Sequence, residues 1–189
     1  MPSDGRLRRS EWAVVPGARW EAEHFCQLWH YSQTAPNTAT YVHVLEERAT
    51  MQHHGAALWI PPTRTAGEAV AGDAWAGVLA LSRLVVAPEM PTNAASFLLG
   101  GSMRQIDRDR WPVLLTYADT RQGHTGAIYR ATNWTCDGPV PAGDVWIDGT
   151  GRQRGRKRGN RTLSAAEMRA AGFERAPAAP KIRFVHRAE

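Results

Sequence analysis

The alternation of apolar and polar residues along the chain predicts a domain that mixes helices with strands. Apolar side chains recur at helical spacing over residues 18–29, which predicts an amphipathic helix. Residues 41–45 and 55–60 are short apolar runs typical of strands, and the charged segment between them predicts a hairpin. Residues 61–73 are rich in Pro, Gly and Thr, and we expect them to form a loop.

The second half of the chain predicts two buried strands, each followed by a helix. The apolar run over residues 75–86 is typical of a strand buried on both faces, and Asn93 can cap the next helix. Residues 112–118 predict another buried strand. Further elements expected are a helix over 125–132, a strand from 134, a turn at Asp148-Gly149, a capped helix from Ser164 to Gly172 and a strand over 181–187. This order predicts a single α/β or α+β domain.

Composition narrows the class of protein. Of the 189 residues 43% are hydrophobic and 22% are charged, a globular balance that suits one domain. Eight Trp residues need a core or a partner surface to cover them. No stretch approaches the roughly 20 apolar residues of a membrane-spanning helix, and two cysteines cannot form a disulfide framework. We therefore expect a cytoplasmic protein without a membrane partner.

The net charge of +5 favours an anionic partner, which the charge alone does not identify. We expect residues 1–15 to be a mobile basic leader ahead of a domain spanning 16–189. A basic loop over 152–161 holds no aromatic residue and suits contact with phosphates better than base stacking. Its basic residues are Arg152, Arg154, Arg156, Lys157, Arg158 and Arg161. A solvated flexible loop is an equal alternative.

The first candidate site lies where the strand ending at residue 86 leads into a helix. Small side chains over residues 92–96 would let backbone N–H groups approach a phosphate at the helix N-terminus, and Arg83 would add a cation. The alternative is that Asn93 caps the helix while Ala94 and Ala95 permit close packing. On spacing alone we favour this second interpretation, because no glycine-rich phosphate loop is present.

The second candidate site follows the buried strand over 112–118. Asp119 ends this strand, His124 lies in a glycine-flanked loop, and Tyr129 comes about one helical turn later. A carboxylate, an imidazole and a phenol gathered at one strand end can transfer protons. A capped turn with Tyr129 in the core is the equal alternative.

A third cluster, His30 and Tyr31, ends the first predicted helix, where such pairs are most often structural. His53-His54 is a weak metal pair, because neighbouring strand residues point to opposite faces. The sequence therefore predicts no metal site by itself.

Taken together and in this order, the clusters resemble the phage Mom family, a divergent branch of the GCN5-related N-acetyltransferase (GNAT) superfamily. The most specific matching part runs from Tyr117-Ala118-Asp119 through the loop over 123–126 to the segment 128–134. Residues 29–32, 81–86, 91–97 and the closing strand at 181–184 also match, so the resemblance covers roughly residues 20 to 187.

The resemblance implies a GNAT-like domain, with a mixed central sheet flanked by helices, that transfers a carbamoylmethyl or acyl-type group to N6 of adenine in phage DNA. Such modification protects the genome from host restriction. Acetyl-CoA or a related acyl-CoA is the implied donor, double-stranded DNA with a flipped or unpaired adenine is the implied substrate, and some members have been linked to iron. Carried over by position, the catalytic candidates are His30, Tyr31, Asp119 and Tyr129, the cofactor site comprises Arg83, Asn93, Ala94, Ala95 and Ser96, and His124 joins the basic loop in contacting DNA.

Two other functions stay open from the sequence. One is a conventional acetyl-CoA-dependent N-acetyltransferase that acts on a protein or a small amine, and the other is a non-catalytic DNA-binding module. The chain departs from the usual glycine-rich phosphate loop at residues 91–95. The transferred group, the DNA context, metal content and a homodimer are left undecided by the sequence. Our hypothesis is that Asp119 accepts a proton or polarises the amine, while Tyr129 or Tyr31 donates to the leaving group.

Overall fold

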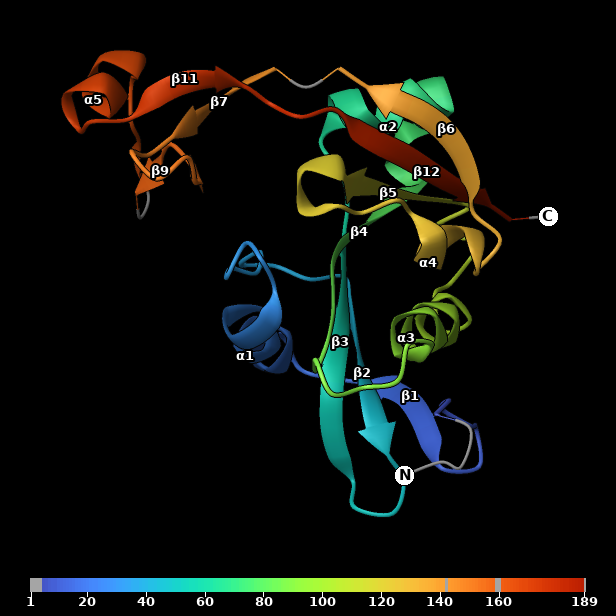
Figure 1. The fold of residues 1–189 in the computed structure, drawn as a ribbon. Coiled ribbons are helices and arrows are strands. Elements are labelled where there is room, and N and C mark those ends of the chain that lie inside the picture. The colour runs from blue at the N-terminus through green and yellow to red at the C-terminus, as the bar shows by residue number, and fades with distance from the viewer. Residues whose placement is uncertain (1–4, 142, 159–160, 189) are drawn as a thin grey trace.

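The computed structural model describes residues 5–141, 143–158 and 161–188, and its centre is a seven-stranded mixed sheet (Figure 1). The strand order is β1-β2-β3-β4-β5-β12-β6. All neighbours are antiparallel except β4 and β5, which are parallel. The strands are β1 (Trp12–Pro16), β2 (Tyr41–Glu47), β3 (Gln52–Ile60), β4 (Val78–Val86), β5 (Val113–Asp119), β6 (Thr135–Val140) and β12 (Lys181–Arg187).

Helices cover both faces of this sheet, with α1 on one side and α3 and α4 on the other (Figure 1). Alternate residues of the strands point to opposite faces. Leu98 of α3 therefore packs with Trp59, Leu114 and Phe184 on one face, whereas Phe25 of α1 packs in a separate cluster on the other. The helices are α1 (Arg19–Trp29), α2 (Arg64–Ala71), α3 (Ala94–Met103) and α4 (Ala127–Arg130), and two short 3-10 helices are η1 (Gly72–Gly77) and η2 (Thr120–Gln122).

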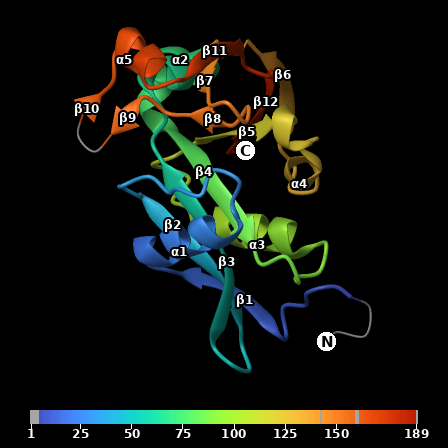
Figure 2. The ribbon, with the colours of Figure 1, turned by 60° about the vertical axis from the view of Figure 1, so that its left-hand side comes forward.

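Residues 144–177, here called the insertion, form a small unit between β6 and β12 that projects on the α1 side of the sheet (Figure 2). The predicted turn at Asp148 and the predicted capping box at Ser164 are both present. The insertion comprises β7 (Asp144–Ile147), β8 (Gln153–Arg154), β9 (Lys157–Arg158), β10 (Arg161–Thr162), α5 (Ala165–Ala170) and β11 (Glu174–Pro177). The expected basic loop is therefore built of short paired strands over its described residues, and residues 159–160 lie outside the description.

Most elements lie where the pattern predicts them, including the first helix, the hairpin, both buried strands and the last strand. The loop expected over 61–73 is wrong, because α2 begins at Arg64, where Thr63 caps it by accepting the N–H of Ala66. This helix is short and contains a glycine, which weakens a periodic signal.

The boundary expected between a mobile leader and the domain is also wrong for the described residues. Trp12–Pro16 forms β1 at the sheet edge, and Leu7 and Trp12 are buried. Asn93 does not cap α3 with its side chain. Its Oδ1 instead accepts the N–H of Leu7 at 2.9 Å and its Nδ2 donates to the Leu7 carbonyl at 3.3 Å, which pins the N-terminal segment to the start of α3.

Candidate active site

The two parallel strands at the centre of the sheet separate after three residue pairs. Pairing joins Val78–Ala80 of β4 to residues 113–115 of β5. Leu58 of β3 then pairs with Arg83, and Trp59 with Leu81, so Ser82 is an extra residue that bulges β4. Where the strands diverge, a cavity of about 410 Å³ opens between them. We call it the splay cavity.

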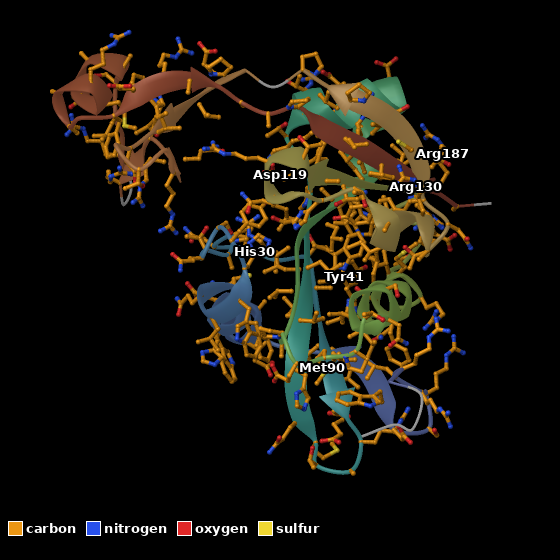
Figure 3. The ribbon with its side chains drawn as sticks, viewed as in Figure 1. His30, Tyr41, Met90, Asp119, Arg130 and Arg187 are labelled. Atoms are coloured by element: carbon orange, nitrogen blue, oxygen red, sulfur yellow. The ribbon has the colours of Figure 1, made fainter. Side chains whose placement is uncertain are left out.

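The splay cavity is lined by aromatic, imidazole and guanidinium groups from three parts of the chain. His30 and Tyr31 come from the end of α1, Arg83 from β4, and His124 from the loop after β5. Figure 3 shows His30 on the α1 side of the sheet, facing the end of β5. Tyr129 of α4 closes the cavity from the other face. The structure thus brings the three sequence clusters together.

Arg83 is held in a fixed position at this cavity. Its Nε donates to the carbonyl of Thr34 at 2.8 Å, and its Nη1 donates to the carbonyl of Ser82 at 2.7 Å. Its pairing partner Leu58 belongs to the cluster beneath α1, which places the Arg83 side chain on that face. The guanidinium therefore joins the loop after α1 to the bulge of β4.

His30 is a neutral hydrogen-bond donor to the cavity. Burial, together with the charges of Arg83 and His124, lowers the pKa of His30 to about 4. Its Nδ1 accepts the backbone N–H of Ser32 at 3.1 Å. A neutral imidazole that accepts at Nδ1 carries its proton on Nε2. This tautomer donates from Nε2 and is unsuited to act as a base there.

Both tyrosines of the cavity keep their protons at neutral pH. Burial raises the pKa of Tyr31, and the negative charge of Asp119 raises it further. Burial also raises the pKa of Tyr129, against a hydrogen bond with Thr116 that lowers it. Tyr31 stacks on His30 with ring centroids 4.3 Å apart. This contact orients the ring of Tyr31 and thereby places its hydroxyl.

Gly126 allows α4 to approach the sheet closely. Its φ is +80°, and a Cβ there would lie 2.2 Å from Cζ of Phe184. Tyr129, three residues later, then packs on Phe184 with centroids 5.1 Å apart. A glycine is required by both the backbone angle and the contact.

Asp119 lies at the rim of the splay cavity and not among its lining residues. It ends β5, where its Oδ1 accepts the N–H of Arg121 at 3.1 Å and its Oδ2 lies 3.9 Å from Nζ of Lys181. Its effect on the pKa of Tyr31 shows that it acts electrostatically on the cavity. Figure 3 shows it at the end of β5, near the α1 side.

The residues predicted to bind the cofactor are divided between two hollows. Arg83 and Ala95 line the splay cavity, whereas Asn93 and Ser96 line a larger groove along α3. Ala94 is fully buried. The first turn of α3 therefore lies between the cavity and the groove. N–H groups in the first turn of a helix have no acceptor within the helix.

The insertion is tied to both loops that border the splay cavity. Arg152 donates to Oε1 of Gln33 in the loop after α1, and Arg121 in η2 donates to the carbonyl of Gly151. The predicted basic residues Arg152, Arg154, Arg156, Arg158 and Arg161 are exposed, and the side chain of Lys157 lies outside the description. His124 was predicted to contact DNA together with these residues. In the structure it lines the splay cavity.

Several of these arginines are bound within the insertion. Arg154 pairs with Asp148 at 2.8 Å, and Arg161 pairs with Glu167. Arg156 donates to the carbonyl of Leu163 at 2.7 Å. Their guanidinium groups are therefore held in place within the insertion.

In the described part of the chain, no three His, Cys, Asp or Glu side chains group closely enough to hold a metal ion. The residues there do not fit an iron site, and we derive no step through iron. No helix among the described residues is both long and apolar enough to cross a membrane.

Thr116 and Gly126 were not singled out from the sequence as functional residues. The Thr116 hydroxyl donates to the Leu81 carbonyl at 3.4 Å across the point where β4 and β5 separate. No local pattern marks this residue, because its role depends on strand divergence. The glycines at 123 and 126 did indicate a turn in the sequence, and this was the one pattern that could have identified Gly126.

Comparisons with known proteins agree with this architecture. The model of the Mom protein family matches residues 11–171. A mutant spermidine N-acetyltransferase of Vibrio cholerae is similar in structure, with a TM-score of 0.56, 9% identity and 95% of each chain covered. A putative acetyltransferase of Salmonella typhimurium with its cofactor acetyl-CoA has a TM-score of 0.56 and 9% identity, over 94% of each chain.

A Bacillus subtilis acetyltransferase in complex with CoA has a TM-score of 0.54 and 5% identity, over 95% of this chain and 100% of the other. No curated protein matches the sequence. At these identities the similarity establishes the fold, which is GNAT-like as the resemblance implied.

Proposed function

The chain belongs to the Mom protein family, and from this premise we propose that it transfers an acyl-type group to the exocyclic amine of adenine in DNA. The observation that carries this proposal is the position of the insertion. Its exposed arginines are tied by Arg152 and Arg121 to the two loops that border the splay cavity. A DNA phosphate backbone held there would present a base to the cavity.

The splay cavity fits the acyl-CoA donor that the family implies. Beyond Ala80 the edge of β4 that faces β5 has left its parallel pairing, so its backbone groups can bind an extended amide chain. We assign residues 81–86 of β4 and Ala95 of α3 to holding the donor. When bound, such a donor supplies an activated acyl group.

The neutral donors of the cavity suit acyl transfer. The Nε2–H of His30 and the hydroxyls of Tyr31 and Tyr129 are oriented by packing, and we propose that they stabilise negative charge as it develops. The fixed guanidinium of Arg83 adds positive charge at the same place. Tyr129 is buried, and His30 and Arg83 are half-buried, which makes their interactions stronger than they would be in water.

Adenine N6 is a poor nucleophile, because its lone pair is conjugated with the purine ring, and it is stacked and paired in duplex DNA. We propose that the base is extruded into the splay cavity, beside His30 and Tyr31. Asp119 is assigned as the group that draws the amine proton, with Oδ2 as the accepting atom because Oδ1 is occupied by the N–H of Arg121.

Expression in a bacterium followed by mass spectrometry of plasmid nucleosides tests the proposal. We expect a new deoxyadenosine derivative that carries its added group at N6. Asp119→Ala should abolish the derivative while the protein stays folded. The matched control is Asp73→Ala, since Asp73 is an exposed carboxylate in η1 that lines neither hollow.

Unmodified DNA from cells rich in folded protein would contradict the proposal. Acetylation of a free amine by the same purified protein would then assign it to the conventional N-acetyltransferases. A full yield of modified DNA from Asp119→Ala would instead remove Asp119 from the mechanism.

A further inference from the structure

A groove of about 1080 Å³, larger than the splay cavity, lies along α3. Its other walls are the N-terminal segment, residues 131–137 and the end of β12. Five arginines line it, and Asp137, which is the only carboxylate among its described lining residues, is paired with Arg183 at 2.6 Å. We call it the arginine groove. Its arginines are Arg6, Arg9, Arg104, Arg108 and Arg187.

The fold brings these arginines together from three parts of the chain, namely the N-terminal segment, the residues at and after the end of α3, and the end of β12. Arg104 makes no ion pair with any described residue. Burial, with the charge of Arg9 nearby, lowers the pKa of Arg104. Arg108 donates from Nη2 to two carbonyls, and its buried Nε finds no hydrogen-bond partner within the described residues. An anion in the groove would relieve the repulsion between these guanidinium groups.

The N-terminal wall of the groove is fixed at one point. Asn93, at the start of α3, binds both backbone groups of Leu7, and Leu7 is buried. Arg6 and Arg9 lie on either side of this anchor. The segment expected to be a loose leader is therefore a built part of the groove.

The arginine groove approaches the splay cavity at the first turn of α3. Ala95 lines the cavity, and the next residue, Ser96, lines the groove together with Asn93. An elongated ligand with its reactive end in the cavity can therefore pass over this turn and place its other end in the groove. The N–H groups of the turn favour negative charge along that path.

Position also separates this groove from the DNA contacts proposed above. The insertion projects on the α1 side of the sheet, whereas α3 and α4 lie on the opposite side (Figure 1). A duplex lying along the insertion would therefore face away from the arginine groove. The groove suits a compact ligand with several negative charges, which is the character of a nucleoside polyphosphate.

We propose that the arginine groove binds the nucleotide phosphates of the acyl donor through Arg9, Arg104 and Arg108. These side chains take the place of the missing glycine-rich phosphate loop. The identity of the donor rests on the proposed function, but the site itself is a nucleotide site that can be tested alone.

Calorimetric titration of the purified chain tests this site with four probes: CoA, adenosine 3′,5′-bisphosphate, pantetheine and a DNA duplex. The bisphosphate carries the phosphates without the pantetheine arm. We expect it to bind the unaltered chain, and we expect the double variant Arg9→Gln with Arg104→Gln to weaken it and CoA by about tenfold or more. Duplex and pantetheine affinities should change by less than about twofold, because neither probe needs the groove.

Two further variants control for charge and for folding. Arg64→Gln removes a guanidinium from α2, outside the groove, and should leave all four affinities unchanged. Arg104→Lys keeps the positive charge and should retain most of the CoA affinity. A thermal melt of each variant confirms that it is folded before titration.

The results separate this inference from the proposed function. Unchanged bisphosphate and CoA affinities in the double variant, or no binding of the bisphosphate by the unaltered chain, would overturn the nucleotide site even if DNA is modified. A selective loss of duplex affinity would also overturn it and assign the groove to DNA. Arginine-dependent bisphosphate binding without DNA modification would support the site and contradict the proposed function.

Discussion

The splay cavity and the arginine groove lie on either side of one helical turn, yet they are built on opposite electrostatic principles. In the cavity, burial lowers the pKa of His30 and raises the pKa of two tyrosines, and these neutral groups surround a single fixed guanidinium. The groove instead collects five guanidinium groups around one paired carboxylate. Neutral, oriented donors suit the stabilisation of charge that develops during a reaction, whereas fixed cations suit the binding of charge already present. The difference indicates that the splay cavity serves the reaction, whereas the arginine groove serves the binding of a charged ligand.

The largest expected effect is on turnover at the cavity alone. Replacing His30 with Ala removes a donor held by the Ser32 N–H, and we expect modification of DNA to fall by about 100-fold or more. The affinity for adenosine 3′,5′-bisphosphate should stay the same, because the groove does not include His30. Nucleoside mass spectrometry and calorimetry measure the two quantities. His24→Ala, an exposed histidine of α1, is the control, and equal losses in both variants would contradict the role of His30.

A second prediction concerns the wall of the cavity that α4 forms. Gly126→Ala combines a strained backbone with a collision against Phe184, and should lower the free energy of unfolding by about 2–4 kcal/mol. Gly123→Ala has a similar φ of +72° but meets no atom within 4 Å, and should cost about 1 kcal/mol. Urea denaturation compares the two variants. Equal losses would show that backbone strain alone accounts for the effect.

Contact between DNA and the insertion should contribute more weakly and should depend on salt. Arg156→Gln with Arg158→Gln removes two exposed cations, and we expect duplex affinity to fall by about three- to tenfold at moderate salt. The slope of log affinity against log salt should decrease by about 2, since each phosphate contact contributes about 1. Binding of the bisphosphate in the groove should not change. If the slope of log affinity against log salt is the same in this variant as in the unaltered chain, the DNA contacts lie elsewhere.

A further prediction concerns the response of the stability to acid. Burial lowers the pKa of His43 to about 4, as it does for His30, so both bind protons more readily in the unfolded chain, where the usual value is about 6.5. Stability should therefore be complete above pH 6.5 and fall as the pH drops from about 6.5 to about 4. Guanidinium groups stay charged throughout, so the arginines of the groove add no slope in this range.

Urea denaturation at several pH values measures this slope, and His43→Asn should reduce it. His43 contacts the Ser102 hydroxyl at 2.7 Å in the core, away from both hollows, so turnover at neutral pH should change little. A slope unaffected by the substitution would assign the acid response to other groups.

Local sequence patterns predicted much of the fold. Periodicity identified α1, the hairpin, both buried strands and β12, because a buried face repeats every 3.6 or 2 residues. The helix over residues 64–71 was not predicted, because a short helix that contains a glycine gives a weak periodic pattern. The strand Trp12–Pro16 was not predicted, because an edge strand that begins after an arginine-rich stretch looks in the sequence like part of a mobile N-terminal segment.

The candidate site could be predicted only in part. His30, Tyr31 and Tyr129 do meet at one cavity, and Arg83 joins them. Asp119 lies at its rim, and the five predicted cofactor residues are divided between cavity, groove and core. Arg104 and Arg108 carried no signal, because a single arginine at or after the end of a helix is unremarkable until others are brought beside it.

By itself, the sequence determined the elements, their order and the chemical groups available, since these depend on neighbours within a few residues. Only the tertiary structure decided which groups meet. The separation of β4 from β5, the bulge at Ser82 and the anchoring of Leu7 by Asn93 are contacts between distant segments. Such contacts follow from how the sheet packs against its helices, and no local pattern encodes them.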